Sequence, residues 1–172
     1  ERRAHEGRGD VLGWLHRRDE ALAAYGAAEA RLPRGASLDR ARLIRKRAGL
    51  LSTGQRVAEA LDAFADADRI VGIPEEGDHA ARAEWVELHL ARASLHYFRG
   101  DLEGLEADLG VVAPWIEASG SPDQQLGLLS ELISAAFRRL RYLVDGETVA
   151  LERRALDLAL RIGDPAAIAV RE

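Results

Sequence analysis

The sequence predicts an all-α fold from its composition, its apolar spacing and a repeated pair of helices. Alanine, leucine and arginine recur throughout the 172 residues, and these side chains lose little rotamer freedom in a helix. Aromatic residues make up only 5% of the chain, whereas strands favour aromatic and β-branched side chains. Apolar residues recur at helical spacing, for example Leu126, Leu129 and Ile133. We therefore expect about eight to nine helices.

The predicted helix pairs share one pattern. Three segments each join two helices through a short polar turn, at residues 16–18, 53–56 and 99–101. Small residues let two helices approach closely, and an aromatic residue one turn further along the same face fills the gap between pairs. The first helices carry Gly9, Ala48 and Ala93 as their small residues. The second helices of the first two segments carry Ala21, Tyr25 and Ala28, then Ala60, Phe64 and Ala67.

This pattern resembles the tetratricopeptide-repeat family, whose helix pairs carry small and aromatic residues in this order and a proline after the second helix. The first segment matches well and ends at Pro33. The third departs from the pattern, because Leu105 replaces alanine and Pro114 is expected to interrupt the second helix. Equivalent positions lie 39, 45 and 46 residues apart, whereas the usual period is about 34. Those positions are Ala21, Ala60, Leu105 and Leu151.

Long, irregular repeats of this kind are similar to the carboxy-terminal tetratricopeptide regions of large bacterial signalling ATPases, including nucleotide-cyclase-linked proteins and LuxR-type regulators. The resemblance implies a right-handed superhelical stack of antiparallel helix pairs, an α-solenoid. We expect a single array over residues 1–172, cut from a longer protein, because the last helix is incomplete and no methionine occurs. The expected repeats span about 2–33, 37–72, 79–119 and 122–163, followed by a partial helix over 165–172.

Helix signals alone define the fourth repeat. Pro122 opens a helix that is expected to run through Leu143. Asp145 can cap the next helix, and Gly163 is expected to end it.

Charge and composition exclude several classes of function. A net charge of -5 and a pI near 5.6 argue against nucleic-acid or anionic-membrane partners. The absence of cysteine excludes disulfides and thiolate metal sites. No apolar run approaches the roughly 20 residues that span a bilayer, and a cytoplasmic location is expected. The basic run at residues 40–47 is expected to pair with neighbouring carboxylates.

Catalytic and metal-binding motifs are missing from the sequence. No serine lies in a Gly-x-Ser-x-Gly elbow, and no phosphate-binding loop occurs. His89 and His96 are seven residues apart, so they stand about 10 Å apart along a helix and cannot share one zinc ion. We therefore expect no enzyme activity, no metal and no cofactor.

The resemblance implies a concave groove lined by the first helix of each pair. Arginines mixed with tryptophan, tyrosine and phenylalanine are typical of a recognition surface. The alternative, that these aromatic residues pack on adjoining helices, stays open, and Trp85 and Trp115 are expected in the core. The candidate groove residues are Arg3, Glu6, Asp10, Trp14, Arg42, Arg45, Ser52, Thr53, Glu87, Leu90, Ser94, Tyr97 and Phe98.

Two functions follow as hypotheses. The first is a protein-interaction or scaffolding module of a larger bacterial regulatory or signalling protein, which binds a peptide, a protein or another domain of its parent in the groove. The second is a small-molecule effector-sensing domain of a transcriptional regulator. An open, continuous groove would favour the first, and a closed polar one the second. A homodimer through an apolar end face at Ile168 and Val170 is a further expectation.

Overall fold

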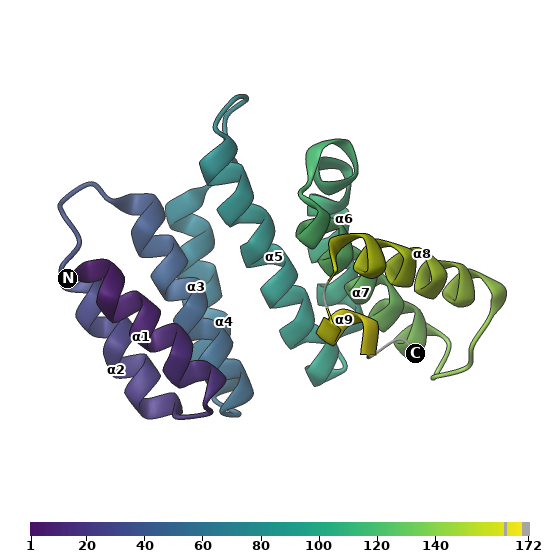
Figure 1. Ribbon diagram of the computed structural model, residues 1–172, viewed down its shortest axis with the longest axis horizontal. Coiled ribbons are helices and arrows are strands. Elements are labelled where there is room, and N and C mark those ends of the chain that lie inside the picture. The colour runs from purple at the N-terminus through teal and green to yellow at the C-terminus, as the bar shows by residue number, and fades with distance from the viewer. Residues whose placement is uncertain (164, 170–172) are drawn as a thin grey trace. The chain divides into compact units, whose positions relative to one another are not determined.

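The computed structural model describes residues 1–163 and 165–169, and these residues form nine α-helices and no strand (Figure 1). The all-α fold class is therefore confirmed. The helices are α1 (Arg2–Trp14), α2 (Arg18–Glu29), α3 (Ser37–Thr53), α4 (Val57–Val71), α5 (His79–Arg99), α6 (Leu102–Ser119), α7 (Pro122–Arg139), α8 (Gly146–Ile162) and α9 (Pro165–Ala169).

The chain divides into two compact units, Glu1–Leu88 and His89–Glu172, and the division falls inside α5. The first unit holds the pairs α1/α2 and α3/α4 with the start of α5. The second holds the remainder of α5 and the helices that follow it. A single array and its right-handed superhelix stay predictions.

Small and aromatic residues join the helix pairs of the first unit. A Cβ atom on Gly9 of α1 would lie 2.4 Å from Cε1 of Tyr25 on α2, so only glycine permits this approach. In the second pair, Phe64 and its neighbours Ala60 and Ala67 are fully buried. The close packing expected from the spacing is confirmed in both pairs.

The turn after the first helix of a pair has the same geometry in the first three pairs, and α7 ends in the same way, with a bond from Tyr142 to Phe137 over 2.7 Å after the left-handed Arg141. In each turn a residue in the left-handed region ends the first helix, and the next N–H donates to a carbonyl five residues back, as in the Schellman motif. The left-handed residues are His16 (φ 57°), Gln55 (φ 61°) and Gly100 (φ 73°). The bonds run from Arg17 to Leu12 (2.8 Å), from Arg56 to Leu51 (2.9 Å) and from Asp101 to His96 (3.0 Å).

Two expectations about the second unit are wrong. Helix α6 continues through Pro114 rather than breaking there. A proline costs a helix one N–H donor, here the one that would reach the carbonyl of Gly110, and the buried apolar face of α6 outweighs that loss. Helix α7 ends at Arg139 rather than Leu143, because Arg141 and Tyr142 adopt left-handed conformations with φ of 51° and 64°.

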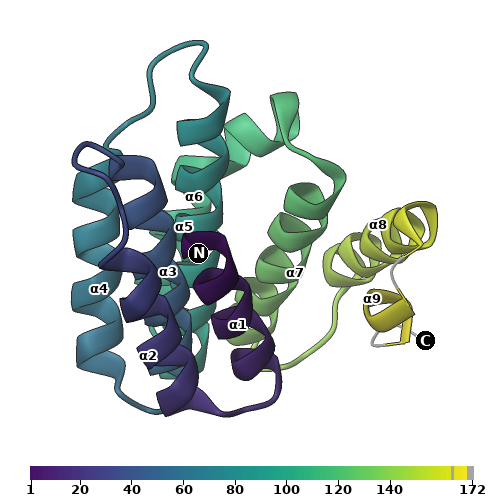
Figure 2. The ribbon, with the colours of Figure 1, turned by 60° about the vertical axis from the view of Figure 1, so that its left-hand side comes forward.

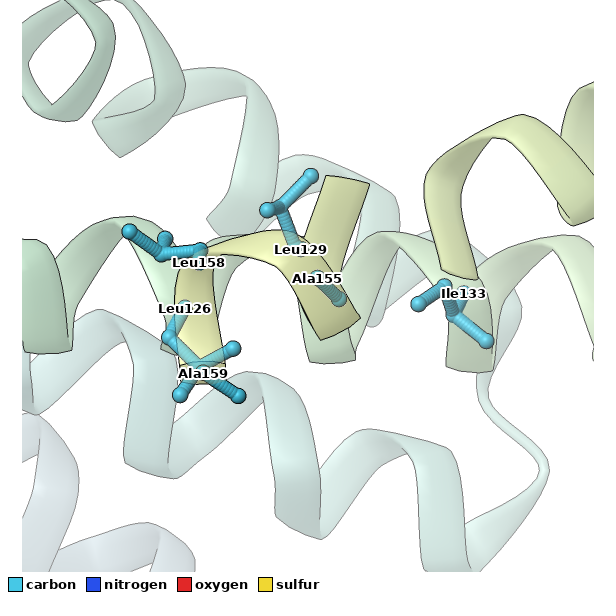
Figure 3. Packing of buried hydrophobic residues seen from close by; sticks show 6 residues of the cluster. All are labelled: Leu126, Leu129, Ile133, Ala155, Leu158 and Ala159. Atoms are coloured by element: carbon cyan, nitrogen blue, oxygen red, sulfur yellow. The ribbon is translucent and has the colours of Figure 1, made fainter. Parts of the chain in front are cut away.

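Helices α7 and α8 share a core of leucine, isoleucine and alanine (Figure 3). The expected signals define α8, since Asp145 accepts from the backbone N–H of Thr148 and Gly163 ends the helix with φ 75°. Ile168 packs against this core and is half-buried, whereas Val170 lies outside the described residues. The core residues are Leu126, Leu129, Ile133, Ala155, Leu158 and Ala159.

The two tryptophans expected in the core differ. Trp85 on α5 is only 5% exposed, which confirms the expectation. Trp115 is 39% exposed, and the expectation for it is wrong. It lies one turn after the exposed Val111, away from the α6 face that buries Leu109 and Val112. No helix in the described part of the chain combines the length and the apolar character needed to cross a membrane.

Candidate interaction surface

The charged candidate residues of α1 and α3 meet in a network of ion pairs. Arg42 donates through Nε to Oε1 of Glu6 over 2.9 Å. Lys46 donates to the same oxygen over 2.9 Å and to Oδ1 of Asp10 over 2.8 Å. Asp39 adds pairs to Arg42 and to Arg2. The expectation that this basic run pairs with carboxylates is confirmed.

The same kind of pairing extends to α5. Arg45 of α3 donates through Nε to Oε1 of Glu84 over 2.6 Å, and the Glu84 side chain is only 8% exposed. On the α2 side, Glu29 is within 3.0 Å of Arg47 and 3.9 Å of Arg40. Helix α3 therefore joins its neighbours through charges on opposite flanks.

The pKa values of two side chains in this network are shifted by burial and by their hydrogen-bond partners. Burial opposes ionisation of Glu6, but hydrogen bonds from Arg42 and Lys46 outweigh that effect and lower its pKa to about 2. The pKa of Tyr25 is raised, first by burial and then by its hydrogen bond of 2.7 Å to Asp10. Cations and carboxylates satisfy one another, so this face offers no vacant charge for an anionic or cationic ligand.

The other candidates of the first unit do not join this network. Trp14 is 81% exposed at the end of α1, and Arg3 is exposed near its start. Ser52 is half-buried, and the Thr53 hydroxyl donates to the carbonyl of Leu50 within its own helix. Glu87 on α5 is half-buried.

The candidates in the second half of α5 face α7. Leu90 packs against α7 at Gly127, where an added Cβ atom would lie 3.2 Å from Cδ1 of Leu90. Ser94 donates a hydrogen bond to Glu131. Burial raises the pKa of that carboxyl to about 7, although the Ser94 bond acts in the opposite direction.

The aromatic candidates at the end of α5 divide between the two open alternatives. The Arg138 guanidinium lies over the ring of Tyr97 at 4.7 Å and donates to its backbone carbonyl over 2.8 Å. Tyr97 thus packs on an adjoining helix. Phe98, in contrast, is 74% exposed and free to meet another molecule.

A buried polar cluster joins α5 to α6. Asp108, only 4% exposed, accepts from His89 over 2.8 Å and from Arg92 over 2.6 Å. Burial opposes ionisation of Asp108, but the bonds to these two residues lower its pKa. His96 lies 2.7 Å from Asp101, the cap of α6. Within the described ranges no group of three or more potential ligands is arranged to hold a metal ion.

A trough lined by apolar and charged side chains lies between α6, α7 and α8, and the sequence did not predict it. Two hollows of about 510 Å³ and about 440 Å³ lie in the second unit, and Leu132 of α7 borders both. Figure 2 shows α7 between α6 and α8, so α7 forms the floor and the other two helices form the walls. The larger hollow is lined by Glu106, Leu109, Gly110, Ala113, Leu132, Ala135, Ala136, Arg139, Leu140, Asp145, Glu147, Thr148 and Leu151. The smaller is lined by Ile116, Glu117, Gln125, Leu128, Leu129, Leu132, Arg154, Asp157, Leu158 and Arg161.

Small residues keep the trough open. Gly110, Ala113 and Ala136 line it with little or no side chain, and a Cβ on Gly110 would meet nothing within 4 Å. The spacing of Leu109, Ala113 and Ile116 gives the only local signal in the sequence, and it is indistinguishable from an ordinary core face. No protein-family model, curated protein or solved structure gives a significant match to the chain.

Proposed function

We propose that this chain is a protein-interaction and scaffolding module that binds a helical segment of a partner protein. The observation that carries the proposal is the trough over α7, whose two hollows combine apolar side chains with charged ones. A groove that receives the apolar face of an amphipathic helix is a common mode of peptide recognition. The proposal places the module in the cytoplasm, within a larger bacterial signalling or transcription-regulating protein, as the resemblance to tetratricopeptide arrays implies.

The length of the trough favours a polypeptide over a small-molecule effector. Its lining on α8 runs from Glu147 to Arg161, a distance of about 21 Å at 1.5 Å per residue. The larger hollow alone, about 510 Å³, has the size of a small-molecule site. A second hollow on the same floor, sharing Leu132, extends the surface beyond what such a ligand would fill.

The charged face of the first unit fits a scaffolding role better than a binding role. The carboxylates of Glu6 and Glu84 are already paired with cations of α3. A peptide that docked there would have to displace these pairs, and it would leave partly buried charges without partners.

Site-specific crosslinking tests the proposal in the cells that make the protein. A photoreactive benzoylphenylalanine at Ala113 would stand on the wall of the trough, and the same group at Asp62 would stand on the exposed side of α4. We expect a covalent adduct with a discrete protein at Ala113 and none at Asp62. Equal adducts at both positions, or a small-molecule adduct only, would contradict the proposed function.

A further inference from the structure

The direction in which a helix lies in the trough can be read from the charges at its two ends. Resting on the proposed function, we infer that the trough takes an amphipathic helix of a partner protein, parallel to α6 and α8. The helix carries Lys or Arg in its first turn and Asp or Glu in its last turn.

The three helices define the axis of the trough. The larger hollow touches the start of α6, the end of α7 and the start of α8, for example at Glu106, Leu140 and Glu147. The smaller hollow touches the end of α6 and of α8, at Glu117 and Arg161. Helices α6 and α8 therefore run in the same direction along the two walls, and the floor helix α7 runs in the opposite direction.

The apolar part of the trough sets the spacing of the partner's apolar residues. Leu109 and Ile116 lie seven residues apart on α6, and Leu151 and Leu158 lie seven apart on α8. Each pair covers two helical turns, or about 10 Å. A partner helix with apolar residues at i, i+3, i+4 and i+7 matches this length, and a helix of about 14 residues reaches both ends.

One end of the trough is acidic. Glu106, Asp145 and Glu147 line the larger hollow there, and Arg139 is the single cation among them. Arg139 is already paired with Glu106 over 2.6 Å. Asp145 caps α8 by accepting from the backbone N–H of Thr148. Glu147 is therefore the carboxylate that attracts a cation and the positive end of a helix dipole, which is the N-terminus.

The other end carries the basic residues of α8. Arg154 and Arg161 line the smaller hollow, with Asp157 between them and Glu117 on the opposite wall. Neither Arg154 nor Arg161 forms an ion pair with another residue in the described part of the chain, so the two guanidinium groups on α8 can pair with a carboxylate in the last turn of the partner. The same orientation places the partner's dipole antiparallel to that of α7, the helix that it contacts along the floor.

The exposed apolar residues of α6 and α8 in a second copy lie on helices that lack the required charge pattern. Val111 and Trp115 are exposed on α6, and Val149 and Leu160 are exposed on α8. Both helices begin with an acidic first turn, which would meet the acidic end of the trough in the inferred orientation. Neither α6 nor α8 of a second copy therefore fits the trough in the inferred orientation.

Two synthetic peptides test the direction with the whole 172-residue chain. Both are hydrocarbon-stapled helices of about 14 residues with one apolar stripe. The first has Lys in its first turn and Glu in its last, and the second exchanges these charges. Fluorescence anisotropy at low salt should show the first peptide binding about five- to tenfold more tightly, as a few exposed charge contacts allow. Equal affinities, or the reverse order, would overturn the inferred direction.

The orientation can also be measured directly, because the chain has no cysteine and a single introduced cysteine takes one label. Glu103→Cys lies near the acidic end of α6, and Ser119→Cys lies at its opposite end. With a donor on the peptide N-terminus, energy transfer should be stronger to residue 103 than to residue 119. Stronger transfer to residue 119 would overturn the proposal.

A matched pair of glycine variants tests the location of the binding site independently of the direction of the bound helix. Neither Gly110 nor Gly49 has an atom within 4 Å of an added Cβ, but only Gly110 lines the trough. Gly110→Phe should weaken binding of the first peptide at least about tenfold, and Gly49→Phe should leave it unchanged. If Gly110→Phe removes the binding of two equally tight peptides, the direction fails and the proposed function survives.

Two further results would test the site and its occupant, and not only the direction of the bound helix. If Gly110→Phe changes nothing, the trough is not the site and the proposed function fails with it. If the chain self-associates in sedimentation and Gly110→Phe abolishes that, the occupant is a second copy and the inference is overturned. A double variant that combines Arg154→Glu with Arg161→Glu should bind the two peptides equally, because the carboxylates in the last turn of the first peptide lose their partners.

Discussion

Gly9 and Tyr25 meet so closely that the ring of Tyr25 occupies the space where a side chain on residue 9 would begin. A Cβ atom there would lie 2.4 Å from Cε1 and 2.5 Å from Cδ1 of the ring. The Tyr25 hydroxyl also donates to Asp10, the next residue of α1, over 2.7 Å. One side chain of α2 thus contacts α1 through its ring and through its hydroxyl.

Gly9→Ala is expected to lower the free energy of unfolding by about 1–3 kcal/mol, because the buried ring of Tyr25 must move. Gly7 lies on the same helix, and a Cβ on it would meet nothing within 4 Å. Gly7→Ala should therefore raise the free energy of unfolding by about 0.5–1 kcal/mol through helix propensity. Urea denaturation followed by circular dichroism measures both values, and a shift of the same sign in the two variants would contradict the packing argument.

Gln55→Gly is expected to raise the free energy of unfolding by about 0.5–1 kcal/mol. Gln55 holds φ at 61°, a conformation that glycine adopts without steric cost. Ala58→Gly, three residues later on the exposed face of α4, should lower stability by about 1 kcal/mol because α4 requires an ordinary helical conformation there. Thermal unfolding of the two variants compares the signs. Destabilisation by Gln55→Gly would mean that the glutamine side chain, and not the backbone, determines the turn.

Glu131→Gln is expected to change how stability depends on pH. Burial raises the pKa of Glu131 to about 7 in the folded chain, so the folded state holds a proton that the unfolded state has released between about pH 4.5 and pH 7. The native chain therefore loses stability as pH rises through this window, by an amount on the order of 1–3 kcal/mol for this one group. The glutamine variant should lose less.

Denaturation at several pH values measures that difference, and Glu117→Gln, at an exposed position, is the control. Oε2 of Glu131 has no hydrogen-bond partner, which is why ionisation is costly at this position. Parallel pH profiles for the native chain and Glu131→Gln would show that water or movement of α7 stabilises the ionised carboxylate.

Contacts near in sequence or fixed by a motif were predictable, and contacts that depend on helix placement were not. The close approach of α1 and α2 at Gly9 was expected from the small residues, and the pairing of Arg42 from the charge run in which it lies. The contact of Gly9 with Tyr25 was not expected, because the spacing assigned Tyr25 to the gap between helix pairs. The burial of Glu131 could not be predicted, because a single glutamate in a helix is usually a surface residue and only the neighbouring helix covers it here. The sequence did not predict the trough for the same reason. Ala113 lines a cavity only because α6 and α8 do not pack against each other there.

The aromatic residues illustrate the same limit. The resemblance to tetratricopeptide repeats implied that Tyr97 and Phe98 line a common groove, yet one packs beneath Arg138 and the other is exposed. Adjacent residues on a helix point about 100° apart. A neighbouring helix that packs on one side therefore buries one of them and leaves the other exposed.

The repeated turn has a consequence for how such a chain can change over generations. Helices α2, α4 and α6 all start directly after the turn, and they measure 12, 15 and 18 residues. Every added residue therefore lies at the end remote from the turn, beside the connections to the next pair. Insertions and deletions in the gene are expected to accumulate at those connections, while the turn is inherited as a fixed point. The segments of this chain are therefore best aligned with one another from turn to turn, and not by counting residues.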